Sequence, residues 1–547
     1  MVSGRAVVGG AIMGLAACGG SADLLLMDGR IWTGTGVEAS AMAVRGGRVV
    51  AVGTTADLER WARSHTERIE LAGRFVVPGF LDSHTHFLDG GFELAGVQLR
   101  DASTPAEFTR RIGAFATQHA SQWITGGTWD HESWGGELPR RDWIDSVTPE
   151  TPVFVSRLDG HMALANTRAL ELAGITGATP DPPGGTIVRD PTGAPTGVLK
   201  DEAMSLVART VPERTPIELN RALDAAVRHA VERGVTHVTD MGGWPGLEAY
   251  RRAAAAGRLP IRVYAAVPIA TWERLAEYVA RHGPGDDRLA WGVVKGFVDG
   301  SLGSTTAWFY EPYADAPATS GLLVTDTAAL RSQIVAAHAA GLHVVIHAIG
   351  DRANDWLLDV YAAARGERIT ADPRFRVEHA QHLTREAIAR FAQVGVLAAM
   401  QPYHAIDDGR WAEKRIGPER IRTTYAFRAL IDAGATVAFG SDWTVAPLDP
   451  LYGIYAGVTR RTLDGAHPGG WVPEQRITVE EALTAYTRAA AYAAFREDDL
   501  GTLEPGKYAD LVVLSGDLRT TPPEQLDRVR VDLTMVGGRI VFRREGT

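Results

Sequence analysis

Eight short runs of apolar and β-branched residues recur through the middle of the chain and alternate with longer runs of helical period. The short runs predict strands and the longer runs predict helices. Two helical runs, LRSQIVAAHAAG and REAIARFAQVG, end in glycine, which is typical of a helix C-terminus. This alternation predicts an α/β fold of the TIM type, a closed (β/α)₈ barrel with its active site at the carboxyl ends of the strands. The expected strands are 80–86, 236–241, 261–267, 293–299, 343–348, 376–379, 397–401 and 436–441.

The barrel pattern is interrupted once and is flanked by β-rich segments at both ends. The interval between the first two expected strands is several times longer than the roughly 30 residues of a βα unit. Residues 100–205 are therefore interpreted as an inserted α+β domain over the mouth, and 79–99 with 206–498 as the barrel. Glycine-broken strand patterns at 23–78 and 499–547 predict one small sheet domain assembled from both chain ends.

Composition narrows the classes of partner and of metal site. Asp and Glu outnumber Lys and Arg, 66 against 56, and no dense basic cluster could follow a phosphate backbone. Nucleic acid is therefore excluded as a partner. The single cysteine, Cys18, excludes an intramolecular disulfide and any site that needs two cysteine ligands. Any metal must be held by histidine, carboxylate or lysine chemistry.

Residues 1–22 have the pattern of a secretory leader, in which Arg5 precedes a short apolar run ending in small residues. The segment LAAC, ending at Cys18, resembles the bacterial lipobox, whose cysteine carries lipid and becomes the new N-terminus. The sequence thus predicts an exported lipoprotein, periplasmic or at the cell surface, held to the membrane only by lipid on Cys18. The alternative is an apolar leader with an inert thiol.

Polar side chains that are costly to bury stand at the ends of several expected strands. His84 and His86 end the first strand, and residues two apart on a strand face the same side, so both imidazoles can share one metal. His347, His379 and Asp442 stand at or just after the ends of the fifth, sixth and eighth expected strands. Because barrel strands converge on one site, this placement predicts a metal centre at the mouth.

Lys295 lies within the fourth expected strand. As an ammonium it has no acceptor and cannot ligate a metal, and burial beside cations would be unfavourable. After reaction with CO₂ its side chain becomes a carbamate, an anion whose two oxygens can bridge two metal ions. The alternative is a lysine paired with Asp299 or with the substrate.

These residues lie in segments that together resemble the amidohydrolase superfamily, specifically the YtcJ-like branch of amidohydrolase family 3, which includes N-substituted formamide deformylases. The resemblance runs from Asp23 to Phe542 and rests on VVPGFLDSHTHF, GHMALANTRAL, VVKGFVDGSLGSTTAWFYEPYAD, VVIHAIGDRAND, RVEHAQHL, MQPYHAIDDGRWAEKRIG, FGSDWTVAPLDPLYGIYAGVTRRT and GTLEPGKYADLVVLS. It implies a composite β-sandwich from both termini, a metal-binding barrel and an inserted domain. It also implies a metal site made of His84, His86, carboxylated Lys295, His347, His379 and Asp442.

A site of this kind implies a hydrolase with one or two Zn²⁺ ions, although other divalent metals suit the same ligands. Zinc lowers the pKa of bound water and polarises a carbonyl. The expected reaction is therefore cleavage of a C–N bond in an amide, N-formyl, carbamate or cyclic amide by a metal-activated hydroxide. Asp442 is the expected general base, and Lys295 and His347 complete the catalytic set. Two alternatives stay open: an esterase or lactonase on the same site, and a non-catalytic surface-binding lipoprotein.

Five further residues are expected to contact a small-molecule substrate. Each has an ordinary alternative: an aromatic side chain usually packs in a core, a lone histidine in an insertion is usually structural, and a polar residue after a strand can orient a ligand instead. The expected sandwich and insertion offer surfaces on which a homodimer could form, although no motif requires one. The five residues are Trp129, His161, Asp351, Gln401 and His404.

Overall fold

The computed structural model describes residues 20–119, 122–367 and 372–546. Cys18 lies outside the described residues, so its lipidation and the export of the chain remain predictions. Within the described ranges, no helix combines the length and the apolar character needed to cross a membrane.

Eight parallel strands form the central barrel, which confirms the predicted fold class. The last strand meets the first at the carboxyl ends, where the amide of Asp442 donates to the carbonyl of His84 over 2.7 Å and the amide of His86 donates to Trp443 over 2.6 Å. The barrel is therefore nearly closed at its mouth. Its strands are β8 (Phe80–Thr85), β14 (Val235–Asp240), β15 (Arg262–Pro268), β16 (Leu289–Phe297), β17 (His343–Ala348), β18 (Arg376–His379), β19 (Leu397–Met400) and β20 (Val437–Phe439).

Helices cover the outside of the barrel, and local sequence signals set their ends. Helix α7 begins with proline behind a capping box in which Thr215 and Glu218 satisfy free amides. Helix α12 ends at Gly395, whose φ of +72° favours glycine, as the sequence pattern predicted. The covering helices are α7 (Pro216–Val231), α8 (Gly243–Ala255), α9 (Trp272–His282), α10 (Thr327–Ala339), α11 (Asp351–Glu367), α12 (Arg385–Val394), α15 (Phe427–Asp432), α16 (Pro450–Thr459), α17 (Val479–Tyr486) and α18 (Arg488–Ala493).

Three other helices lie close to the mouth: α2 (Phe87–Glu93), α13 (Pro402–Asp408) and α14 (Ala412–Arg420). The insertion between α2 and α7 is a five-stranded mixed sheet of order β12-β13-β11-β10-β9 with its own apolar core. Its elements are α3 (Pro105–Gln118), β9 (Ile124–Trp129), α4 (Arg141–Asp145), β10 (Val153–Arg157), β11 (Met162–Ala165), α5 (Thr167–Leu172), β12 (Gly185–Arg189), β13 (Pro195–Asp201) and α6 (Ser205–Ala208).

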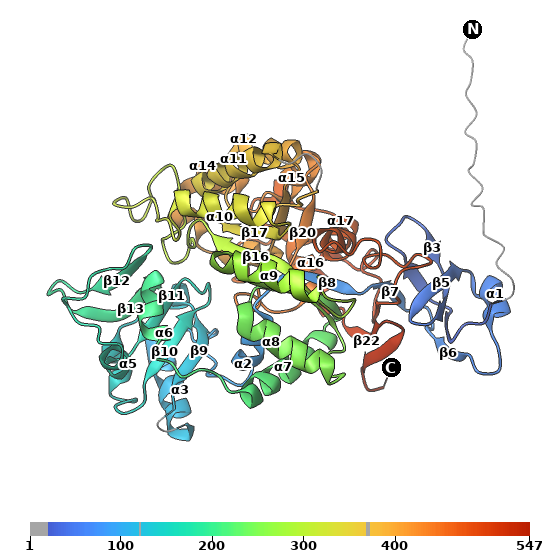
Figure 1. Cartoon of the computed structure of the whole chain (residues 1–547), viewed down its shortest axis with the longest axis horizontal. Coiled ribbons are helices and arrows are strands. Elements are labelled where there is room, and N and C mark those ends of the chain that lie inside the picture. Colours follow the sequence, from blue (N-terminus) through green and yellow to red (C-terminus); the bar gives the residue numbers. More distant parts are fainter. Residues whose placement is uncertain (1–19, 120–121, 368–371, 547) are drawn as a thin grey trace, which may run out of the picture.

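Both ends of the chain build two small sheets that share one apolar core, which includes Leu26, Val44 and Leu533. One sheet contains β1 (Leu24–Met27), β4 (Ala41–Arg45), β5 (Arg48–Gly53) and β6 (Glu67–Glu70). The other contains β2 (Arg30–Trp32), β3 (Glu38–Ala39), β7 (Phe75–Pro78), β21 (Leu511–Leu514), β22 (Val531–Val536) and β23 (Arg539–Arg543). This composite sandwich and the insertion lie at opposite ends of the barrel (Figure 1). The exact residues at which these domains meet remain predictions.

A buried ion pair joins the sandwich to the barrel. Arg262, the first residue of β15, donates from Nε to Asp510 Oδ2 over 2.7 Å and from Nη2 to Asp510 Oδ1 over 3.0 Å. Its Nη1 reaches Asp287 at 2.7 Å. Arg262 stands at the amino end of its strand, so the sandwich is attached at the barrel face opposite the mouth.

Replacing Arg262 with leucine should leave the carboxylate of Asp510, which is 6% exposed, without its charged partner and with only the amide of Gly537 as a donor within the described residues. Breaking a buried pair in this way costs about 3–5 kcal/mol, and urea denaturation would measure the loss. Arg258→Leu is a matched control, because Arg258 pairs with Asp224 at the surface and such pairs contribute less than about 1 kcal/mol. Equal losses in the two variants would contradict this role for Arg262.

Candidate metal centre

Three buried side chains that are far apart in the sequence meet at the barrel mouth, each in or just after a barrel strand. His84, His379 and Asp442 each offer one ligand atom, and these atoms all lie within 4.8 Å of one another. His86 joins them, since its Nε2 lies 3.4 Å from Asp442 Oδ1, as does His84 Nε2. The ring of His347 lies 4.5 Å from that of His379, measured between ring centroids. The structure thus brings together all five of the histidine and aspartate ligands expected from the sequence.

The carboxylate of Asp442 accepts no hydrogen bond at Oδ1 within the described residues, although this atom is buried. Burial would raise the pKa of Asp442, but the neighbouring His84 and His86 outweigh it and hold the pKa below its ordinary value. A buried anionic oxygen without a donor is costly. Because two imidazole nitrogens converge on the same atom, the donor set suits a divalent cation.

His379 and His347 each commit one ring nitrogen to a neighbouring oxygen. His379 Nδ1 lies 2.9 Å from the side-chain oxygen of Gln401, and His347 Nε2 lies 3.0 Å from the carbonyl of Gly300. Both oxygens are acceptors, so these nitrogens donate, which leaves the lone pair on the opposite nitrogen of each ring. Burial lowers the pKa of both imidazoles well below the usual value, which favours the neutral form that ligates metals.

Glu378 holds His84 in the same manner, and sequence reasoning missed it. His84 Nδ1 lies 2.5 Å from Glu378 Oε2, and the carboxylate is held in turn by Arg376, whose Nε and Nη2 donate over 2.8 and 3.0 Å. All three side chains are fully buried. Residues 376 and 378 alternate on one strand and share its inner face. That Arg-x-Glu pattern in a barrel strand is a signal that could have revealed the pair.

Lys295 reaches the same centre from β16. Its Nζ lies 3.4 Å from His84 Nε2 and 4.8 Å from the centre of the Phe297 ring. Burial lowers the pKa of Lys295 to about 8. Lys295 does not pair with Asp299, which was the alternative considered from the sequence. The carboxylate of Asp299 instead accepts hydrogen bonds from the amides of Trp308, Ile349 and Gly350.

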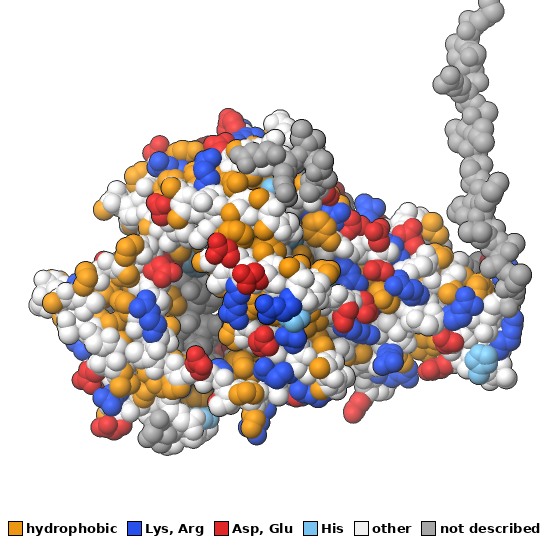
Figure 2. Space-filling model, viewed as in Figure 1, with side chains coloured by type: hydrophobic (Ala, Val, Ile, Leu, Met, Phe, Trp, Pro, Cys, Tyr) orange, Lys and Arg blue, Asp and Glu red, His pale blue; other side chains and the backbone are white. Residues whose placement is uncertain are grey.

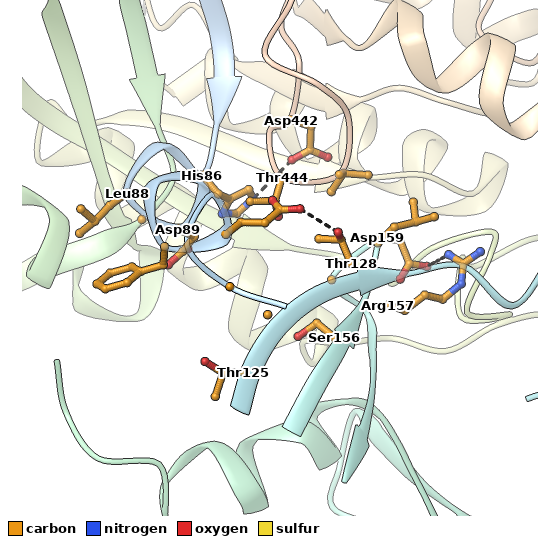
Figure 3. A pocket seen from close by; sticks show the side chains of 18 of the residues that line it. His86, Leu88, Asp89, Thr125, Thr128, Ser156, Arg157, Asp159, Asp442 and Thr444 are labelled. Atoms are coloured by element: carbon orange, nitrogen blue, oxygen red, sulfur yellow. Dashed lines mark hydrogen bonds and ion pairs between the residues drawn. The ribbon is translucent and has the colours of Figure 1, made fainter. Parts of the chain in front are cut away.

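A cavity of about 1180 Å³ lies between the barrel mouth and the insertion. Figure 2 shows this face of the molecule hollowed between the two parts. In Figure 3, His86 and Asp442 face the cavity from the barrel, and Thr125, Thr128 and Ser156 face it from the insertion. The other expected ligands that line it are Lys295, His347 and His379.

Two of the five expected substrate contacts line this cavity. His161 lies beside His347, with 4.9 Å between ring centroids, and its Nδ1 is 2.7 Å from Asp201 Oδ1. His404 also lines the cavity, and its Nε2 lies 4.0 Å from Asp442 Oδ2. This nitrogen has no hydrogen-bond partner in the described part of the chain. Both histidines are therefore positioned to meet a ligand.

The other three expected contacts lie elsewhere. Trp129 is fully buried in the core of the insertion, where its indole donates to the carbonyl of Val155 over 2.8 Å. Asp351 begins α11 and accepts from the amide of Tyr310 over 3.0 Å. Gln401 is 1% exposed and orients His379 instead of facing the cavity. Trp129 therefore packs in a core, and Gln401 orients a histidine. Asp351 holds the backbone of the loop that contains Tyr310.

The fold and the donor set together define a metal-dependent hydrolase built on a (β/α)₈ barrel. A model of the amidohydrolase family matches residues 67–542. The chain belongs to the amidohydrolase family, which confirms the resemblance seen in the sequence motifs.

Individual relatives cover most of the chain. It is 44% identical over 514 residues to the protein LONG AFTER FAR-RED 3 of Arabidopsis thaliana, covering 90% of this chain and 87% of that protein. It is 32% identical to the putative amidohydrolase YtcJ of Bacillus subtilis, covering 93% and 97% of the two chains. It is 30% identical to an N-substituted formamide deformylase of Arthrobacter pascens, covering 93% and 96%.

A solved structure is also similar. It is that of an uncharacterized metal-dependent hydrolase from Pyrococcus horikoshii, with a TM-score of 0.75 and 30% identity, covering 92% of this chain and 99% of the other. The similarity includes the barrel, the insertion and the terminal sheets, because it extends over nearly the whole length of both chains.

Replacing Glu378 with glutamine should weaken metal binding by about 10–100-fold, because an amide holds the Nδ1–H of His84 less strongly than a carboxylate. Competition with a chromophoric chelator would measure the affinity. Glu386→Gln, in the exposed first turn of α12, is the matched control. An affinity equal to that of the control would show that Glu378 does not support His84.

Proposed function

We propose that this protein hydrolyses a C–N bond of a small molecule, in an amide, N-formyl, carbamate or cyclic amide group. The observation that carries the proposal is the buried, unsatisfied Oδ1 of Asp442 beside His84 and His86 at the floor of a cavity large enough for a substrate. The similarity to a relative named as a formamide deformylase supports this bond type.

Two ions would divide the ligands between them. His84, His86 and Asp442 would hold one, and His347 with His379 would hold the other. Zinc suits these nitrogen and oxygen donors, and other divalent metals do as well. When bound, such an ion would supply Lewis acidity, lowering the pKa of water and polarising the scissile carbonyl.

The two oxygens of Asp442 have different surroundings, which supports separate tasks for them. Oδ1 faces His84 and His86, whereas Oδ2 lies 3.8 Å from His379 Nδ1 and 4.0 Å from His404 Nε2. Asp442 would accept a proton from the attacking water and pass it to the leaving nitrogen. His161, beside His347, and His404, near Asp442, would hold the carbonyl group of the substrate.

Lys295 would complete the site as a carbamate. The lone pair of the neutral amine would attack the carbon of CO₂. As the C–N bond forms, the electrons of one C=O π bond move onto oxygen and one N–H proton passes to solvent water, which leaves an anion with two oxygens. Burial outweighs the nearby charges of Glu378 and Asp442, which raise the pKa of Lys295, and so favours the neutral amine that this reaction needs. An anion here would add oxygen ligands to the centre, beside His84 Nε2, which lies 3.4 Å from Nζ.

Replacing Lys295 with alanine should lower the metal content from near two equivalents and reduce hydrolysis of the best N-acyl or N-formyl compound by at least about 100-fold, a barrier increase of about 2.7 kcal/mol. Elemental analysis of protein purified without chelator would be paired with a substrate panel that includes esters and lactones.

Lys414→Ala is the matched control, because this lysine is half exposed on α14 and pairs with Glu132. Wild-type protein that folds but carries negligible metal would overturn the hydrolase proposal. Turnover of esters alone would overturn the bond type and retain the metal centre.

A further inference from the structure

We propose that the insertion is part of the metal centre, with Asp159 and Lys200 acting as positioning residues for His347. The connection is the loop 299–306, which follows β16 and lies between the mouth and the insertion. The carbonyl of Gly300 in this loop accepts the hydrogen bond from His347 Nε2 at 3.0 Å. The inference rests on the proposed function, because it takes His347 as a metal ligand.

Asp159 of the insertion holds the loop through two hydroxyl groups. Its Oδ2 accepts from Ser304 Oγ over 2.8 Å and also from Ser301 Oγ. Burial would raise the pKa of Asp159, but the adjacent guanidinium of Arg157, 2.7 Å away, outweighs it and keeps the carboxylate ionised. Ionised carboxylates make stronger hydrogen bonds than neutral acceptors, so this contact restrains the loop firmly.

Lys200, at the end of β13, holds the loop at a second point. Its Nζ donates to the carbonyl of Ser304 over 2.7 Å. The loop is internally tight as well, because the amide of Ser304 donates to Ser301 Oγ and the amide of Ser301 donates to Thr306 Oγ1, each over 3.0 Å. The restraint applied at Ser301 and Ser304 therefore reaches the adjacent Gly300.

The loop and the insertion are also matched in shape. A methyl group added at Gly303 would meet Arg157 Nη1 at 2.2 Å. One added at Gly300 would first meet Thr306 Oγ1 of the same loop at 2.0 Å and then Asp201 Oδ1 at 2.8 Å. The absence of a side chain therefore lets the backbone approach closely at both positions. The neighbouring Asp201 also orients His161, whose ring packs beside His347. Hydrogen bonds and close packing thus join this edge of the insertion to one metal ligand.

These contacts determine the orientation of the His347 imidazole. A carbonyl that accepts from Nε2–H fixes both the ring plane of His347 and its tautomer, and so directs the Nδ1 lone pair to the centre. If Asp159 and Lys200 release the loop, the position of Gly300 becomes less defined and the ring of His347 is held less firmly, because the next acceptor, Asp299 Oδ1, is 3.6 Å from its Nε2. The ion held by His347 should weaken, while the ion held by His84, His86 and Asp442 should not.

The test measures metal affinity in the full-length protein, with Co²⁺ as the probe. Absorption bands from bound Co²⁺ would be recorded during titration of the wild type, Asp159→Asn and Lys200→Met. We expect the weaker of two binding steps to fall by about 10–100-fold in both variants, with the other step and its spectrum unchanged. Asp181→Asn is the matched control, since this insertion carboxylate binds Arg189 away from the mouth.

Wild-type affinity for both ions in Asp159→Asn and Lys200→Met would overturn the inference. If Asp159→Asn fails to fold, Ser304→Ala removes one hydroxyl from the same contact and should weaken the same step to a smaller extent. An unchanged second step in Ser304→Ala would then overturn the inference. A wild type that binds no Co²⁺ would overturn the proposed function itself, which is a distinct result.

Discussion

The burial of the Asp442 carboxylate against the imidazoles of His84 and His86 is the interaction on which the rest of the structure depends. Isolated burial of an anionic oxygen is strongly unfavourable, so the barrel must supply compensating groups from several strands. The same residues also close the barrel, since the amide of Asp442 bonds the carbonyl of His84. The φ angle of Asp442 is +57°, an unusual value for a residue other than glycine. Barrel closure and ligand placement are therefore coupled at this point.

The composite sandwich and the insertion contact the barrel at opposite ends, and only the insertion lies at the mouth. The composite sandwich attaches at the opposite face through Arg262 and Asp510, and it leaves the carboxyl ends of the strands open. The insertion covers those ends and contributes His161 to the cavity. Without the insertion, the ligand side chains at the barrel mouth would face solvent directly. The insertion adds a second wall to this face and makes a partly enclosed cavity, in which charges interact more strongly than in open water.

Much of the barrel and of its ligand set could be predicted because both follow from local sequence. The strands and helices could be distinguished because their hydrophobic periods differ. His347 and Asp442 could be predicted as site residues because a polar side chain at the carboxyl end of a barrel strand lies close to the mouth. Glu378 was missed because its role depends on His84, a residue far away in the sequence. Trp129 was expected as a substrate contact, with core packing as the alternative, and it lies in the core of the insertion. Sequence spacing cannot distinguish an aromatic side chain in such a core from one on a cavity wall.

The most direct test is a crystal structure from protein purified without chelator, with diffraction measured on both sides of the absorption edges of zinc and of the other divalent transition metals that suit these ligands. The account predicts one anomalous peak between His84, His86 and Asp442 and a second beside His347 and His379, with electron density continuing beyond Lys295 Nζ. An ordered mouth without an anomalous peak at the edge of any divalent transition metal would contradict it.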